Sequence, residues 1–283
     1  MLTEIKTASG AQYAFTFPAG SGERAGEQYR LGLRFCDNPV CRCGIVTVRL
    51  LPDEPGSVTE YTAAHTPSCE AILDLFKQKL DTGNQPGSVS QQAAGAALVR
   101  ALSEQDWQLL SRIFYAYKRQ ITDDTPDDRI EASFPVADIV QDSAMVSFHG
   151  ILPYADYTTL QIDDRHFQLD ELYCVKSDCA CTDVAVGLLD LSAQQDVADI
   201  ALLAPVAVLF FNYRTQHWRI EEAGDEDLPF LNRIAETLKA DAKARSFQRH
   251  HARLKSLYRA YQARHSRHAI SVPALQSVGR SDP

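Results

Sequence analysis

The sequence predicts an α+β protein made of two related, strand-rich units, with a helical segment between them and a long basic helix near the C-terminus. The main observation is a cysteine spacing, C-x4-C-x-C, that occurs twice with an offset of 138 residues, in the triplets Cys36, Cys41, Cys43 and Cys174, Cys179, Cys181. An aromatic residue precedes each triplet, and an alternating apolar stretch typical of a half-buried strand follows it. These shared features indicate a duplicated unit with a thiolate cluster at its centre.

Segments that alternate in polarity, bounded by turn residues, predict strands on both sides of each triplet. In the first unit they are residues 11–17, 28–35, 45–51 and 57–65. In the second unit residues 134–141, 145–153 and 157–163 are strand-like, and residues 166–173 lead into the second triplet. After the triplet come the apolar stretch 184–191, a buried run at 200–211 and the segment 212–222. The order of strands, cysteines and strand is therefore the same in both units.

Two predicted helices lie between the triplets. A short one over residues 70–80, capped by Ser68, follows from apolar residues at helical spacing. A longer one over residues 94–120 restarts at Ser103, because Asp106 three residues later completes a capping-box pattern. Its stripe of large apolar residues is typical of a helix packed on a core.

The last predicted element is a long helix with Asp227 as its N-cap and Pro229 in its first turn. Between Lys239 and His268 it carries a net charge of +8, whereas the whole chain carries −9. An acidic body with a basic segment suggests either an internal docking pair or a binding arm for an acidic partner. The candidate partner-binding residues are Arg245, Arg249, Arg253, Lys255 and Arg259.

The chain length of 283 residues suits about two domains. The predicted boundaries are a first cysteine unit at 1–80, a helical connector at 81–130, a second cysteine unit at 131–226, the basic helix at 227–268 and a flexible tail at 269–283. The N-terminal segment has no secretory-signal pattern, and no stretch reaches the length of a membrane helix. A cytoplasmic protein without membrane contact is therefore expected.

Six of the seven cysteines belong to the two triplets, which in a reducing compartment favours a metal site over disulfides. Thiolates suit zinc or an iron–sulfur cluster. The second gap of one residue differs from the ferredoxin spacing, so zinc is the preferred ion. A further hypothesis is that the triplets are remnants that no longer bind a metal.

Structural zinc takes four ligands, so each triplet lacks one. For the first triplet the candidate is Cys69, with His65 as the alternative. For the second the candidates are His166 and His217, of which His166 is nearer in sequence. These candidates do not correspond under the 138-residue offset, so the two sites are expected to differ in their fourth ligand or to leave it open.

The segments FCDNPVCRC and LYCVKSDCACTDVAV resemble the Tyr-Cys-x-Asn-Pro-x-Cys-x-Cys segment of bacterial proteins that often end in a SEC-C zinc motif. The final VGRSDP is similar to the lead-in to that motif, whose own cysteines are not in this sequence. In the second copy Lys176 and Ser177 stand where Asn-Pro would be expected. The resemblance implies an interaction role, because SEC-C motifs serve as zinc-dependent docking modules for ribosomes and chaperones.

Three functions follow from these residues. The first is a zinc-binding scaffold whose basic helix contacts an acidic partner such as ribosome, RNA or protein. The second is a metal-dependent hydrolase that uses an open zinc position, although no histidine or glutamate stands in a recognisable base motif beside either triplet. The third is a redox sensor in which the C-x-C thiols release the metal.

Overall fold

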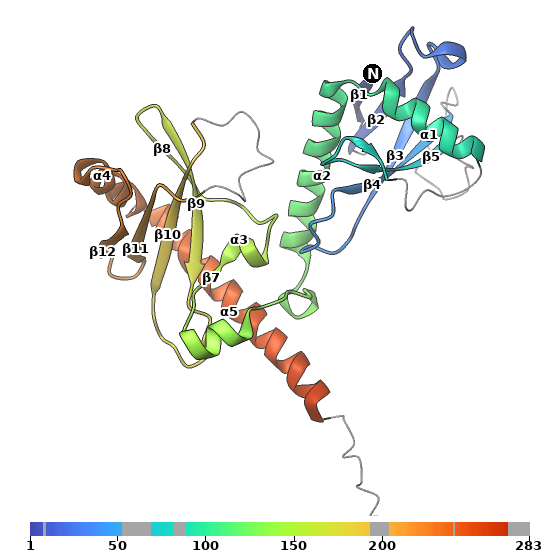
Figure 1. The fold of residues 1–283 in the computed structure, drawn as a ribbon. Coiled ribbons are helices and arrows are strands. Elements are labelled where there is room, and N and C mark those ends of the chain that lie inside the picture. Colours follow the sequence, from blue (N-terminus) through green and yellow to red (C-terminus); the bar gives the residue numbers. More distant parts are fainter. Residues whose placement is uncertain (8–9, 53–68, 82–88, 193–203, 240, 271–283) are drawn as a thin grey trace, which may run out of the picture. The chain divides into compact units, whose positions relative to one another are not determined.

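The structure is a computed structural model that describes residues 1–7, 10–52, 69–81, 89–192, 204–239 and 241–270 (Figure 1). It has helices and antiparallel sheets, which confirms the predicted α+β class. The chain forms two compact units, Met1–Ile121 and Thr122–Pro283. The helices between the triplets thus belong largely to the first unit, whereas the sequence predicted a separate connector at 81–130.

The first unit is a six-stranded antiparallel meander followed by two helices. The strands follow one another in the sheet in the order of the chain. They are β1 (Leu2–Thr7), β2 (Gly10–Thr16), β3 (Gln28–Phe35), β4 (Ile45–Pro52), β5 (Cys69–Asp74) and β6 (Lys79–Leu80), with a 3-10 turn η1 (Gly22–Arg24) before β3. The helices are α1 (Val89–Ala101) and α2 (Glu104–Asp124).

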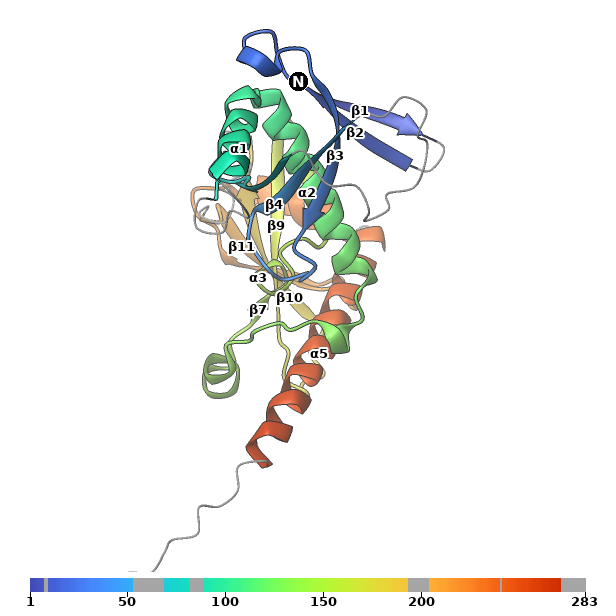
Figure 2. The same ribbon diagram turned by 90° about the vertical axis from the view of Figure 1, so that its right-hand side faces the viewer.

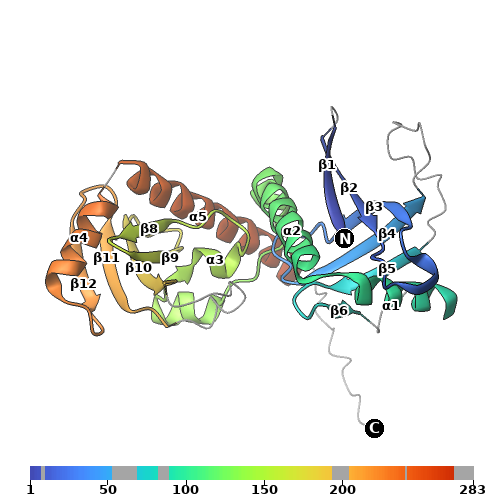
Figure 3. The same cartoon turned by 90° about the horizontal axis from the view of Figure 1, so that it is seen from above.

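The second unit has the same plan with an additional segment in front. Figure 3 shows α5 lying along its sheet. The additional segment contains the helical turns η2 (Asp127–Arg129) and η3 (Asp138–Asp142), the strand β7 (Val146–Ser147) and the helix α3 (Phe148–Ile151). The sheet continues with β8 (Thr159–Ile162), β9 (Arg165–Tyr173), β10 (Asp183–Asp190), β11 (Ala207–Asn212) and β12 (Trp218–Glu222), and the helices are α4 (Leu228–Leu238) and α5 (Asp241–Ile270).

The 138-residue offset of the cysteines extends through the sheets in register. Phe35 pairs with Val46 between β3 and β4, and Tyr173 pairs with Val184 between β9 and β10. Every one of the seven residue pairs between β3 and β4 has its counterpart at this offset between β9 and β10. The six pairs between β4 and β5 correspond in the same way to those between β10 and β11. The central strands of the two sheets are therefore structural repeats.

The hairpin after the third repeated strand is also built twice from the same interactions. In the first unit the Asp74 Oδ1 atom accepts hydrogen bonds from two backbone N–H groups of the turn. In the second unit Asn212 Oδ1 does the same at the corresponding positions. Gln78 and Gln216, again 138 residues apart, both have positive φ angles in these turns. An aspartate or asparagine side chain that binds the backbone two residues on is a standard way to start a turn.

This turn explains why residues 70–80 are not the helix that their spacing predicted. Cys69, Ala71 and Leu73 alternate with less buried residues and point into the core of the first sheet. Apolar residues at helical and at strand spacing overlap in such a short run, so the pairing with β4 decides the outcome. The predicted helix is replaced by β5, a turn and β6.

The predicted caps and breaks in the other helices are mostly confirmed. Ser103 and Asp106 form the reciprocal capping box at the start of α2. Asp227 accepts a hydrogen bond from the Phe230 N–H at the start of α4. The single helix predicted for 227–268 is instead two helices, α4 and α5.

Two strands predicted early in the second unit, at 134–141 and 145–153, differ from the observed elements. The first stretch contains η3, and the second gives only the two-residue strand β7 followed by α3. Ser147 ends the strand because its side chain accepts the Gly150 N–H as the N-cap of α3. The strand predicted at 57–65 lies outside the described residues.

Each core is formed where the repeated strands face the helices that follow them. In the first unit the buried face of β4 comprises Val46, Val48 and Leu50, and α2 contributes Leu110 and Phe114. In the second unit Phe211 of β11 packs against Phe247 of α5, with ring centroids 5.8 Å apart. No helix in the part of the chain that the structure describes is long and apolar enough to span a membrane.

Candidate metal centres

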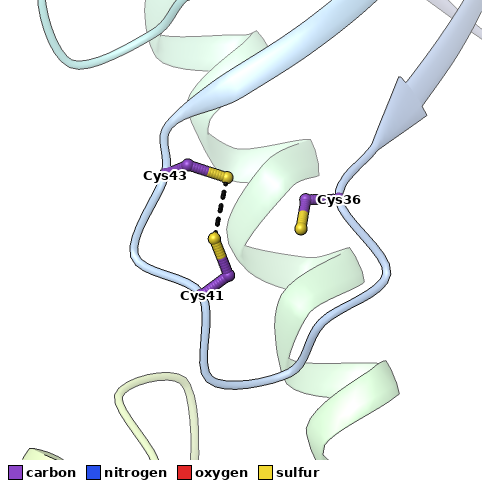
Figure 4. Close-up of side chains that lie close together, drawn as sticks. All are labelled: Cys36, Cys41 and Cys43. Carbon is purple, nitrogen blue, oxygen red and sulfur yellow. Dashed lines mark hydrogen bonds between the residues drawn. The ribbon is translucent and has the colours of Figure 1, made fainter.

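The first cysteine triplet forms a compact group at one end of the first sheet. Cys36 follows the last residue of β3, and Cys41 and Cys43 lie on the loop that leads into β4 (Figure 4). The three Sγ atoms lie within 4.8 Å of one another, and those of Cys41 and Cys43 are 3.1 Å apart. A hydrogen bond from the Cys41 N–H to the Asn38 carbonyl, 3.2 Å long, turns the loop back so that the thiols meet.

The second triplet forms the same group between β9 and β10. Cys174, Cys179 and Cys181 have Sγ atoms within the same 4.8 Å limit. The loop is turned by a hydrogen bond from the Cys179 N–H to the Lys176 carbonyl, again 3.2 Å long and at the corresponding position. Lys176 replaces Asn38, so this turn does not depend on the Asn-Pro pair of the first copy. The triads are therefore repeated in backbone geometry as well as in spacing.

Both groups fit a tetrahedral thiolate-binding ion. With metal–sulfur bonds of about 2.3 Å, the sulfur atoms of a tetrahedral zinc site lie about 3.8 Å apart. That separation lies between the 3.1 Å distance of the Cys41 and Cys43 sulfur atoms and the 4.8 Å upper bound for all sulfur pairs of the triad. Three half-buried thiols without disulfide partners are donors that zinc and other soft ions prefer.

The thiols within each triad differ in proton affinity. Hydrogen bonds with Cys43 lower the pKa of Cys41, whereas burial raises the pKa of Cys43 to about 11. In the second triad the Cys181 backbone N–H lowers the pKa of Cys179, and burial raises the pKa of Cys181 to about 12. The middle cysteine of each triad therefore releases its proton more readily than the last one.

A helix from the end of each unit fixes the backbone of the cysteine loop. In the first unit Lys118 of α2 is fully buried, and its Nζ donates to the carbonyl oxygens of Cys36 at 3.0 Å and Asn38 at 2.8 Å. Its ammonium group also contributes to the lowered pKa of Cys41. A positive charge beside three thiols stabilises their deprotonated form, which is the form that binds metals.

In the second unit two residues of α5, Lys255 and His251, bind the backbone of the cysteine loop. Lys255 Nζ donates to the Cys179 carbonyl, and its charge contributes to the lowered pKa of Cys179. The His251 Nε2 atom lies 2.7 Å from the Cys174 carbonyl oxygen. Because that oxygen only accepts, His251 carries its proton on Nε2, and its Nδ1 accepts from the Tyr213 hydroxyl at 2.9 Å.

These helix residues correspond between the units. Phe114 packs on Phe35 with ring centroids 5.8 Å apart, and His251 stacks on Tyr173 at 5.0 Å. In both helices the lysine follows four residues later, which is one helical turn. Lys118 was not among the predicted site residues, and Lys255 was predicted only as a partner-binding residue, not as a neighbour of the thiols. The available signal was a lysine that continues the apolar stripe of its helix at the i+4 position.

The structure does not bring Cys69 or His166, the two preferred fourth ligands, to the triads. Cys69 is fully buried and pairs with Leu50, about 17 Å along β4 from the strand end that follows Cys43. It occupies the place that Ala207 has in the second unit. His166 lies at the start of β9, eight residues and roughly 26 Å from Cys174.

Two further candidates remain. His217 is exposed next to the hairpin between β11 and β12, and it is not part of the thiol group. His65 lies outside the described residues. Among the residues that the structure describes, neither triad includes a fourth cysteine, histidine or carboxylate within the same distance.

The candidate partner-binding residues of the basic helix fall into two groups. Arg253 and Lys255 are half-buried and have partners inside the second unit: Arg253 pairs with Asp127 at 3.3 Å, and Lys255 binds the cysteine loop. Arg245, Arg249 and Arg259 are exposed. The exposed set is therefore smaller than the sequence predicted.

A buried polar cluster next to the second triad is replaced by apolar residues at the corresponding positions of the first unit. Glu171 is fully buried and accepts hydrogen bonds from Tyr173 at 2.6 Å and Thr158 at 2.5 Å, and it lies 2.7 Å from His250 Nδ1. Although burial alone would raise it, these partners keep the pKa of Glu171 below its ordinary value. At the corresponding positions the first unit has Leu33, Phe35 and Ile113.

Comparison of the chain with protein-family models, with curated proteins and with solved structures finds no match. The resemblance to SEC-C-associated proteins therefore stays a prediction. The informative comparison is the internal one, between the two units.

Proposed function

We propose that this protein is a cytoplasmic scaffold in which two zinc ions, one per triad, stabilise duplicated α+β units. The observation that carries the proposal is that the same thiol-bearing loop occurs twice, in the same strand register and with the same turn hydrogen bond. Three thiols that converge in two repeats are a donor set typical of zinc.

The surroundings of the triads favour a structural role for the metal. Each loop joins two neighbouring strands, and its backbone carbonyl groups accept hydrogen bonds from a lysine of a helix much later in the chain. An ion bound there would connect the ends of two strands close to the helix that covers them. Metal binding would then contribute directly to the folding free energy of each unit.

The decisive measurement is the metal content of the full-length protein purified under reducing conditions. We expect two equivalents of zinc in the wild type and one in each of the variants Cys36→Ser and Cys174→Ser. The double variant should contain none. A wild-type protein without bound metal would exclude the proposal. Iron together with inorganic sulfide would show that the triads hold an iron–sulfur cluster and not zinc.

The exposed arginines of α5 support a second element of the proposal, a contact with an acidic partner such as RNA, ribosome or an acidic protein. Arg245, Arg249 and Arg259 leave the helix surface positively charged. If the partner is a nucleic acid, its affinity should fall steeply with salt concentration. Binding that is independent of ionic strength would exclude phosphate contacts.

One observation favours a different function, a zinc-dependent hydrolase. Three ligands leave a coordination position for water, and such open sites activate water as a nucleophile. X-ray absorption distinguishes the two cases. A shell of four sulfur or nitrogen ligands excludes the hydrolase, whereas a bound water oxygen at either site supports it. The 3.1 Å contact between Cys41 and Cys43 also suits a redox sensor, for which peroxide should release the metal.

A further inference from the structure

In the second unit the edge of β9 next to the cysteine loop is covered by the segment β7–α3. Val146 pairs with Tyr173, and Ser147 pairs with Leu172. The aromatic ring of Phe148 then stacks on His250 of α5, with ring centroids 4.1 Å apart, and meets the ring of Tyr173 edge-on at 6.5 Å. A β-branched residue, a small polar residue and an aromatic residue thus close this edge.

In the described part of the first unit the corresponding edge of β3 has no strand paired with it. β2 pairs with β3 only from Gln28 to Arg30, and the β1–β2 hairpin then diverges from the rest of the sheet (Figure 2). Beyond Arg30, no strand in the described part of the chain pairs with this side of β3. Arg34 and Phe35 stand where the second unit has Leu172 and Tyr173, the two residues that pair with β7.

The side chains around this edge are suited to a contact. Leu33 and Ile113 are apolar and only half-buried. In the second unit Glu171 takes the position of Leu33 and is fully buried. His250 takes the position of Ile113, and its side chain is only 12% exposed because Phe148 stacks on it. An exposed strand edge beside apolar side chains is a site for strand addition.

We propose that the Leu31–Phe35 edge of β3 binds an extended segment of a partner protein with the order β-branched residue, aspartate, aromatic residue. The sister unit supplies the template for the first and third positions, Val146 and Phe148. The second position follows from charge. In the second unit Ser147 faces the same side as Leu172 and donates to Asp170 at 2.8 Å.

In the first unit the positions of Leu172 and Asp170 are taken by the exposed Arg34 and by Gly32. An acidic side chain in place of Ser147 would therefore meet a positive charge and no carboxylate. Opposite charges on directly paired residues of neighbouring strands stabilise each other. Aspartate is preferred to glutamate because it also caps a following helical turn, as Ser147 does for α3.

The surface lies in a different unit from the basic helix, and the inference needs neither the metal identity nor the RNA contact proposed above. The test uses full-length protein and fluorescein-labelled peptides that copy residues 144–152, with Ser147→Asp or with Ser147→Asn. Asparagine caps the helical turn as well as aspartate does but carries no charge. The measurement is fluorescence anisotropy at low salt.

We expect the Ser147→Asp peptide to bind about three- to fivefold more tightly than the Ser147→Asn peptide. This difference should disappear in the protein variant Arg34→Gln and persist in the control Arg214→Gln, which removes an exposed arginine of the second unit outside the basic helix. Replacing Phe148 by alanine in the peptide should weaken binding by about tenfold. Arg34→Gln changes only an exposed side chain, so its fold should be retained.

Absence of binding at about 1 mM peptide would overturn the proposal. So would a difference between the two peptides that is unchanged in Arg34→Gln, because the peptide would then bind elsewhere, for instance by displacing β7–α3 in the second unit. Self-association of the wild-type protein that Arg34→Gln abolishes would make a second copy the occupant and would contradict a separate partner.

Discussion

The Lys118 ammonium group donates a hydrogen bond to the Cys36 carbonyl oxygen, across 82 residues of sequence and from inside the core of the first unit. A lysine is rarely fully buried unless its charge has partners. Here the partners are two carbonyl groups of the cysteine loop and, close by, the thiols themselves. The helix that ends the unit thus holds the loop in the conformation in which its three sulfur atoms converge.

The first prediction concerns this lysine. Lys118→Met should lower the free energy of unfolding by about 2–3 kcal/mol, because two part-buried carbonyl oxygens lose their donor. The same variant should bind zinc more weakly, since a charge that favours the thiolates is removed. Urea denaturation and a competitive zinc titration measure the two effects.

The matched control is Arg112→Met, which removes an exposed positive charge from the same helix. It should change the stability by less than about 0.5 kcal/mol. Equal effects of the two substitutions would show that Lys118 acts only through the net charge of the helix.

The second prediction concerns Cys69, the fourth-ligand candidate that the fold places away from the triad. Cys69→Ala should leave the zinc content unchanged, because the sister unit has Ala207 at this position. The stability should fall by about 1 kcal/mol, the order expected when a small buried apolar group is lost. Cys43→Ala serves as the comparison and should lose about one equivalent. Loss of zinc in Cys69→Ala would show that Cys69 is a ligand of the metal after all.

The third prediction concerns the buried pair of Glu171 and His250. Glu171→Leu alone should cost about 3 kcal/mol, because three hydrogen-bonding partners lose their acceptor. Combining it with His250→Ile reproduces the Leu33 and Ile113 pair of the first unit. The double variant should be at least about 1 kcal/mol more stable than the sum of the single effects predicts. Additive effects in a double-mutant cycle would show that the two residues do not interact.

The fourth prediction concerns pH. Burial lowers the pKa of His149 to about 4, from its ordinary value of 6.5. Between these values the unfolded chain binds a proton that the folded protein does not, so stability falls as the pH drops from 6.5 toward 4. At pH 5 the loss from this residue should be about 2 kcal/mol relative to pH 7.5.

The pH effect is measured by urea denaturation of the wild type and of His149→Gln, whose amide retains a donor for the Asp156 carbonyl that His149 Nε2 approaches at 3.2 Å. The variant should lose clearly less stability than the wild type over the same interval. An identical loss in both proteins would assign the acid sensitivity to other groups.

The sequence by itself determined the features that depend on local spacing. The two C-x4-C-x-C triplets, the alternating strands beside them, the Ser103–Asp106 capping box and the Asp227 cap are all short-range patterns, and the structure contains each of them. Such patterns are readable because a strand has a period of two residues and a cap acts over three.

Only the tertiary structure decided which residues surround the triads. Cys69 is a cysteine like the ligands, and His166 is close to Cys174 in sequence. Strand geometry nevertheless places each of them at the end of a strand that is far from the triad. Lys118 and Lys255 are far away in sequence and come close because a helix that covers a sheet crosses the ends of its strands. Residues 70–80 became two strands because pairing with β4 outweighed their helical spacing. In each case the deciding interaction is a contact between distant parts of the chain, which no local pattern encodes.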